Sequence, residues 1–199
     1  TAANGSDFTG TTTVTIPAGQ SSASFNIATL DDSLAEGTEN FTITLSGATG
    51  GNFENVVVAG SGVGGDITTD LVDNDTASVV ITDAGSVVEA NGNYLTYNVS
   101  LSNAVAANTT VTLSLTGGAT SGADYSNLQY FNGTAWVAVP ANNQITLPAT
   151  GDAVQVRVAV LDDAATENAE TVILNAGSSS NPLVSTGDTG SGTITDDRG

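Results

Sequence analysis

Apolar and polar side chains alternate with a period of two along most of the chain. The alternation is clearest at residues 41–45, 94–101 and 111–115, where β-branched, aromatic or leucine side chains alternate with Thr, Ser and Asn. Such a pattern is typical of strands that bury one face. Turn-forming pairs such as Asn91-Gly92 and Asn132-Gly133 separate the segments, and no segment has the helical spacing of apolar residues. The pattern predicts an all-β protein folded as sandwiches of antiparallel strands.

The sequence also repeats itself at an offset of 131 residues. Residues 14–18 (Val-Thr-Ile-Pro-Ala) return as residues 145–149 (Ile-Thr-Leu-Pro-Ala), and Leu30-Asp31-Asp32 returns as Leu161-Asp162-Asp163. Each copy ends on a related acidic segment. Two copies of one module therefore stand in tandem, and we predict a first domain at residues 1–75 and a second at residues 76–199.

The two copies differ in length. Residues 128–140 of the second copy have no counterpart in the first and, with Asn132-Gly133 among them, predict an additional β-hairpin. Asp7 and Asp124 are matched residues, yet only six residues precede Asp7, whereas residues 76–123 of the second module precede Asp124. The first module therefore lacks about three early strands in this chain. We expect these strands upstream in a longer parent protein, with strand donation by another chain, or self-assembly, as the alternative.

Composition excludes many kinds of chemistry. The net charge is −19, from 21 acids and two arginines, Arg157 and Arg198, and His, Cys, Met and Lys are absent. Zinc and haem sites, thiol nucleophiles, Ser-His-Asp triads and lysine Schiff bases are therefore excluded. The lack of a basic patch argues against nucleic acid as a partner, and the lack of an apolar run of about 20 residues argues against membrane insertion. The lysine-free surface, rich in Thr, Asn and Gly, favours a secreted, extracellular or cell-surface protein.

Fifteen of the 21 acids fall at the ends of predicted strands, and most of them are matched between the two copies. Because alternate connections of a sandwich share one pole, we expect these side chains to converge at one pole of each module. The candidate metal ligands are Asp7, Asp31, Asp32, Glu36, Glu39, Asp73 and Asp75 in the first copy, and Glu89, Asp124, Asp162, Asp163, Glu167, Glu170, Asp196 and Asp197 in the second.

Such crowding of carboxylates calls for a cation. Two like charges about 4 Å apart repel by about 4 kcal/mol at an effective dielectric constant near 20. Several hard oxygen ligands without nitrogen or sulfur select Ca²⁺ over Zn²⁺ or Cu²⁺, and Mg²⁺ prefers fewer protein carboxylates. We predict two or more Ca²⁺ ions in the complete module. The alternatives are solvated loop acids, or a carboxylate-pair hydrolase, which would need one asymmetric cleft rather than two matched sets. We therefore predict that the chain is not an enzyme.

The second module resembles the Calx-beta family, the calcium-binding sandwich of sodium–calcium exchangers, integrin β4 and many bacterial surface proteins. The motifs are Gly122-Ala123-Asp124-Tyr125, Thr146-Leu147-Pro148-Ala149, the acidic segment 161–171 and Gly192-Thr193-Ile194-Thr195-Asp196-Asp197. The resemblance implies tandem immunoglobulin-like antiparallel β-sandwiches, the first without its early strands. It also implies Ca²⁺ at the pole nearest the C-terminal end of each module.

For the second module the resemblance implies the same eight ligands as those named above. Arg198 stands where the family commonly has a third terminal acid, which predicts that one ion is lost or weakened. In the first module Asn74 replaces the middle terminal acid, and the early glutamate lies outside this chain, so that site is expected to be incomplete. The predicted hairpin resembles the long form of the module in giant bacterial adhesins.

These observations together predict calcium-binding extender modules of a bacterial cell-surface adhesin or secreted filament, in which Ca²⁺ stiffens the modules and their linker. The expected partners are neighbouring modules of the same chain, with a cell-surface or carbohydrate ligand bound elsewhere in the parent protein. Two alternatives stay open: a Ca²⁺-sensing regulatory module and a noncatalytic accessory module of a secreted enzyme. Affinity would separate the first, because a sensor needs micromolar affinity and an extracellular spacer works at millimolar Ca²⁺.

Overall fold

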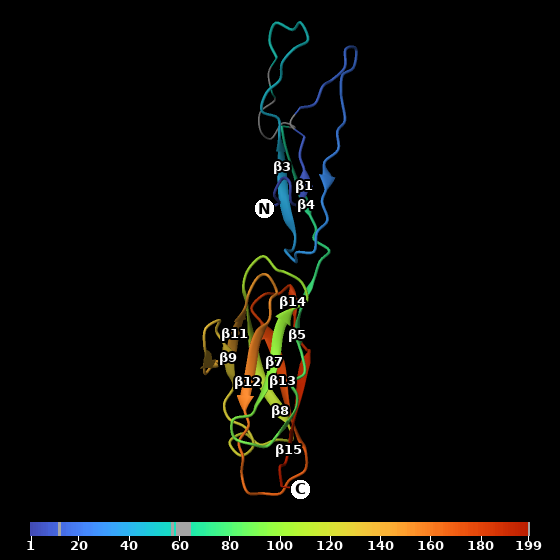
Figure 1. Ribbon diagram of the computed structural model, residues 1–199. Helices are drawn as coiled ribbons and strands as arrows, with labels where there is room; N and C mark the ends of the chain where they lie inside the picture. The colour runs from blue at the N-terminus through green and yellow to red at the C-terminus, as the bar shows by residue number, and fades with distance from the viewer. Residues whose placement is uncertain (12, 57, 59–64, 199) are drawn as a thin grey trace. The chain divides into compact units, whose positions relative to one another are not determined.

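The computed structural model describes residues 1–11, 13–56, 58 and 65–198 (Figure 1). Within these residues every regular element is a β-strand, which confirms the predicted all-β class. No helix among them is long and apolar enough to cross a membrane. The chain divides into two compact units, Thr1–Asp75 and Thr76–Gly199, and each is described by itself below.

The second unit is a sandwich of two sheets. One sheet has the strand order β10-β9-β12-β7-β5-β14 and the other has the order β11-β8-β13-β15-β6. Most neighbours are antiparallel, but β14 pairs with β5, and β15 with β6, in parallel. The strands are β5 (Ala77–Ile81), β6 (Gly85–Val88), β7 (Tyr94–Leu101), β8 (Thr109–Gly117), β9 (Gln129–Phe131), β10 (Trp136–Ala138), β11 (Gln144–Leu147), β12 (Val154–Ala159), β13 (Glu170–Ser179), β14 (Val184–Ser185) and β15 (Thr189–Thr195).

The core of this unit lies between the two sheets and follows from the period-two pattern. On β7, Leu95, Tyr97 and Val99 are fully buried, and the residues between them are partly or fully exposed. The Tyr97 hydroxyl crosses to the other sheet and donates a hydrogen bond of 2.7 Å to the Val172 carbonyl on β13. A Cβ on Gly192 would stand 2.8 Å from that hydroxyl, so only glycine allows β15 to pass so close. These contacts fix the position of the two sheets relative to each other.

The segment after Asp124 forms a hairpin of β9 and β10, which extends the first sheet through β12. The Arg157 guanidinium on β12 lies 3.8 Å from the ring centre of Tyr94 and 4.0 Å from that of Trp136. Its Nε donates a hydrogen bond of 3.0 Å to Gln129. Cation–π contacts on both rings and this hydrogen bond fasten the hairpin to the sheet. Arg157 is therefore engaged in packing, away from the predicted metal ligands.

The strands described in the first unit are counterparts of later strands of the second unit. Its strands are β1 (Phe8–Thr9), β2 (Ala28–Thr29), β3 (Glu39–Thr44) and β4 (Asp66–Leu71), paired as β1-β2 and β3-β4. By the sequence repeat, β3 and β4 correspond to β13 and β15. In the second unit those two strands also pair with β8 and β6, whereas among the described residues β3 and β4 pair only with each other. Phe8 and Phe41 stack at 4.4 Å between ring centres, while Ile16, Leu45 and Ile67 are more than half exposed.

Candidate metal centre

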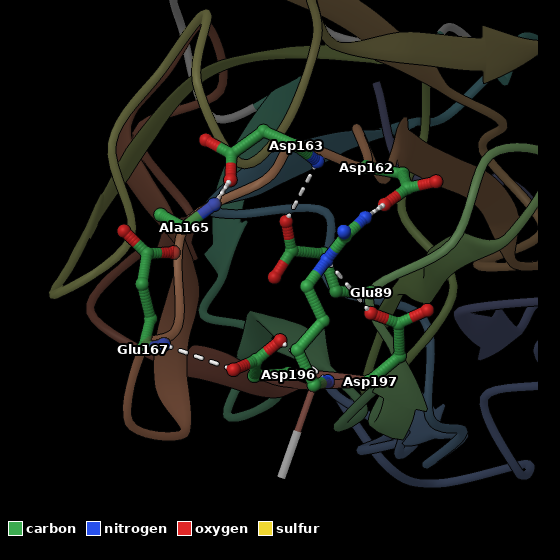
Figure 2. Close-up of polar contacts among 8 residues, drawn as sticks. Glu89, Asp162, Asp163, Ala165, Glu167, Asp196 and Asp197 are labelled. Atoms are coloured by element: carbon green, nitrogen blue, oxygen red, sulfur yellow. Dashed lines mark hydrogen bonds and ion pairs between the residues drawn. The ribbon is translucent and has the colours of Figure 1, made fainter.

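One pole of the second unit collects acids from distant parts of the chain. The parallel pairing of β6 with β15 places the C-terminal ends of both strands at the same pole, so Glu89 and Asp196 come together. Antiparallel pairing of β13 with β15 puts Glu170 opposite Ile194, near the same end. The connection between β12 and β13 crosses this pole. Figure 2 shows how acids from these segments point toward one another.

The carboxylate oxygens form two groups, and within each group they lie within 4.8 Å of one another. One group is Glu89, Asp163 and Glu167, and the other is Asp124, Glu167 and Glu170, so Glu167 belongs to both. Glu89 and Asp124 are only 4% exposed although each is an acid. Burying a carboxylate is costly without compensation, and here neighbouring negative charges add to the cost. A bound cation would compensate both.

Backbone hydrogen bonds hold this arrangement in place. Asp196 accepts hydrogen bonds of 2.9 Å from the backbone N–H groups of Glu167 and Arg198 (Figure 2). Glu89 accepts one of 3.1 Å from the N–H of Asp163, and Asp124 accepts one from the N–H of Thr120. Asp196 therefore fixes the loop that presents Glu167, and Glu89 fixes the loop that presents Asp163.

Three of the eight predicted ligands, Asp162, Asp196 and Asp197, lie outside both groups. Asp162 accepts a hydrogen bond of 2.9 Å from the Arg198 guanidinium, and Asp197 lies 3.4 Å from its Nε. Of the eight acids predicted for this module, the structure brings five into the two groups. Asp196 accepts backbone hydrogen bonds beside them, and Asp162 and Asp197 pair with Arg198. The sequence marked Arg198 as an unusual cation in an acidic motif, but the ion pairs themselves were missed.

The first unit has a comparable hollow. All seven acids that the sequence predicts for this unit line it, and the carboxylate oxygens of Asp7, Glu36 and Glu39 lie within 4.8 Å of one another. Asp73 accepts hydrogen bonds from the N–H groups of Glu36 at 2.8 Å and Asp75 at 2.9 Å. In the second unit Asp196 accepts the equivalent hydrogen bonds from the N–H groups of Glu167 and Arg198. The remaining acids that line the hollow are Asp31, Asp32, Asp70 and Asp75.

The electrostatics of both poles indicate a surplus of negative charge. The pKa values of Glu36 and Glu167 are raised above the usual glutamate value. Desolvation is the largest cause, and repulsion from nearby carboxylates adds to it. A hydrogen bond with the Asp124 side chain, followed by desolvation, raises the pKa of Glu170. The donor atoms are oxygens throughout, several from carboxylates, which fits Ca²⁺ and does not fit Zn²⁺ or Cu²⁺. These residues would hold such an ion, and the ion would supply the missing positive charge.

The pKa values of Asp73 and Asp196 are shifted in the opposite direction, below the usual aspartate value. The backbone N–H of Asp75 lowers the pKa of Asp73, and the backbone N–H groups of Arg198 and Glu167 lower the pKa of Asp196. Hydrogen bonds to a carboxylate favour its ionised form. These two acids are therefore expected to stay ionised at acidic pH while they hold the loops.

We expect the ion-free protein to become more stable as the pH falls from 7 to about 5. Glutamates with a raised pKa bind more protons in the folded than in the unfolded state within this range, so protonation favours the fold. Below about pH 4 the sign reverses, because the acids with a lowered pKa must take up protons. Urea midpoints of metal-stripped protein at pH 7, 6, 5 and 3.5 test this. A midpoint that falls steadily from pH 7 to 5 would contradict the expectation.

The Calx-beta domain model matches residues 72–197, which is more than half of the chain. The chain belongs to the Calx-beta family. This is a family of calcium-binding modules, and the match confirms the predicted family for the second unit. Residues 6–70 match a different family model, the LapA domain. The description of residues 1–75 as a second, incomplete Calx-beta module stays a prediction.

Solved structures similar to this Calx-beta chain include other Calx domains. The apo-form Calx CBD1 domain is 17% identical with a TM-score of 0.47, and the match covers 62% of this chain and 99% of that one. CBD12 from CALX1.2 is 17% identical with a TM-score of 0.43, covering 59% and 44%. The calcium binding domain CBD12 of CALX1.1 is 16% identical with a TM-score of 0.42, covering 61% and 44%. No curated protein matches the chain at a significant level.

Proposed function

We propose that the chain serves as calcium-binding extender modules of a bacterial cell-surface adhesin or secreted filament, and that its Calx-beta module is noncatalytic. The observation that carries the proposal is the convergence of five acids at one pole, with Glu167 shared by two groups of carboxylates. Two groups that share a ligand suit a pair of ions. The matched acids of the first unit support a repeated structural role better than a single reaction centre.

Ca²⁺ would act mechanically in such a module. Without an ion, repulsion between carboxylates loosens the connection between β12 and β13 and the end of β15. With ions bound, segments that are far apart in the sequence share ligands and are held together. In the first unit Asp75 lines the acidic hollow and is followed directly by Thr76, the first residue of the second unit. An ion held by Asp75 would therefore also restrain the chain where the next module begins.

The proposal places the protein outside the cell or on its surface, with neighbouring modules as its main partners and no nucleic acid or membrane insertion. A surface or carbohydrate ligand would bind elsewhere in the parent protein. The lysine-free composition and the charge of −19 support this location. Extracellular Ca²⁺ is millimolar, so weak sites suffice for a spacer, whereas a regulatory sensor would need micromolar affinity.

Small-angle X-ray scattering of the whole chain tests the mechanical role. In millimolar Ca²⁺ we expect a profile that a single arrangement of the two units fits. After EDTA treatment we expect a broader distribution of distances, and re-addition of Ca²⁺, but not of the same concentration of Mg²⁺, restores the first profile. Identical profiles with and without Ca²⁺ would contradict the extender role. Calcium titration of the same sample distinguishes a spacer from a micromolar sensor.

A further inference from the structure

Arg198 lies among the acids of the Calx-beta pole, and three polar atoms of this residue face three different carboxylates. Its Nη2 donates to Asp162 Oδ1 at 2.9 Å, its Nε lies 3.4 Å from Asp197 Oδ1, and its backbone N–H donates to Asp196 Oδ1 at 2.9 Å (Figure 2). The chain has only two side-chain cations against 21 acids. One of the two cations therefore lies among the acids of this pole.

The first unit carries the opposite charge at the matched position. Residue 75 of the first unit corresponds to residue 198 of the second, and both donate a backbone hydrogen bond of 2.9 Å to the Oδ1 of the aspartate two residues earlier. The backbone turn is thus the same in both units. The side chain differs: Asp75 adds a carboxylate to the hollow of its unit, and Arg198 adds a guanidinium to its pole.

This difference extends to the partners of the two residues. Asp31 corresponds to Asp162 in the repeat and lines the acidic hollow of the first unit. Asp162 and Asp197 belong to neither carboxylate group of the second unit, and Arg198 already neutralises part of their charge. A guanidinium and a divalent cation bind the same oxygen atoms, so they compete for them. Among the described residues, no side-chain cation pairs with the five acids of the two carboxylate groups.

The solvent exposure of Arg198 determines how strongly its guanidinium binds these carboxylates. Its side chain is 44% exposed, and ion pairs in contact with water are weak and screened by salt. The guanidinium therefore reduces the affinity for an additional ion without blocking it permanently. In the ion-free protein the same contacts reduce repulsion at the pole, and they need no external cation.

We infer that Arg198 is a tethered cation that replaces one Ca²⁺ ion at Asp162 and Asp197, so that the Calx-beta module binds one ion fewer with high affinity and depends less on Ca²⁺ for its stability. This inference rests on the proposed function, because it requires that the other acids of the pole bind Ca²⁺. It identifies residue 198 as the determinant of ion number, with Asp75 as its natural counterpart.

Isothermal titration of the 199-residue chain with CaCl₂ tests the inference on wild type, R198D, R198Q and R157Q. R198D recreates the residue of the first unit and is expected to add one bound Ca²⁺ ion. R198Q removes the competing charge and is expected to tighten the weakest ion about tenfold. R157Q removes the same charge from β12, where Arg157 contacts Tyr94, Trp136 and Gln129, and is expected to keep the ion number of wild type.

Melting in EDTA gives a second measurement. R198Q is expected to melt several degrees below wild type in EDTA and close to wild type in saturating Ca²⁺, whereas R157Q loses the same amount in both. Equal ion numbers and affinities in wild type, R198D and R198Q would overturn the inference while leaving the proposed function intact. An equal gain in R157Q would also overturn it, because the effect would then reflect net charge alone. Failure of wild type to bind Ca²⁺ would overturn both proposals.

Discussion

Chelation of Ca²⁺ is expected to lower the melting temperature of the Calx-beta module by at least about ten degrees. Each ion present at 100 times its dissociation constant stabilises the fold by about 2.7 kcal/mol, so two ions contribute about 5 kcal/mol. For a module of this size each kcal/mol shifts the melting temperature by about 3–5 °C. The predicted shift for two ions is therefore about 15–25 °C.

The physical origin of this shift lies in the two carboxylate groups. Glu89 and Asp124 are buried, and desolvation together with repulsion from neighbouring carboxylates raises the pKa of Glu167. A bound ion would offset this repulsion. Calorimetry in EDTA and in rising CaCl₂ checks the prediction, with MgCl₂ at equal ionic strength as the control for screening. A melting temperature that is independent of Ca²⁺, or that rises equally with Mg²⁺, would contradict selective binding at this pole.

Replacement of Glu167 by glutamine is expected to have the largest effect of any single substitution on Ca²⁺ binding. Glu167 contributes to both carboxylate groups, so Glu167→Gln removes charge from two sites at once. We expect the affinity of the module for Ca²⁺ to fall about 100-fold or more. The side chain is exposed and packs no core, so the fold itself is expected to remain intact.

The same substitution is expected to act in the opposite direction without Ca²⁺. Desolvation and the negative charges of Asp124, Asp163 and Glu89 raise the pKa of Glu167, so a neutral amide relieves repulsion in the ion-free protein. Glu167→Gln should therefore melt above wild type in EDTA and below it in saturating Ca²⁺. Asp152→Asn is the matched control, since Asp152 is an exposed loop acid that accepts a hydrogen bond of 2.7 Å from Thr150. A variant of Glu167 with wild-type affinity would exclude it as a ligand.

The hydrophobic pattern was sufficient to predict the class of fold but not every pairing. The alternation on β7 places Leu95, Tyr97 and Val99 in the core, as period two requires. The parallel pairing of β6 with β15 was not predicted, because alternation of apolar residues is the same whichever way a neighbouring strand runs. That pairing decides the site, since it brings Glu89 to the end of β15 from more than 100 residues away in the sequence.

The sequence by itself determined the repeat, the all-β class and the set of acids available for Ca²⁺, because these are properties of local pattern and residue type. Only the tertiary structure decided which acids lie close enough together to share an ion. Glu89 meets Asp163 and Glu167 through strand register and backbone hydrogen bonds, whereas Asp162, the direct neighbour of Asp163, turns to Arg198. Asp162 and Asp163 lie in the connection that follows β12, and different contacts place these sequence neighbours in different electrostatic environments.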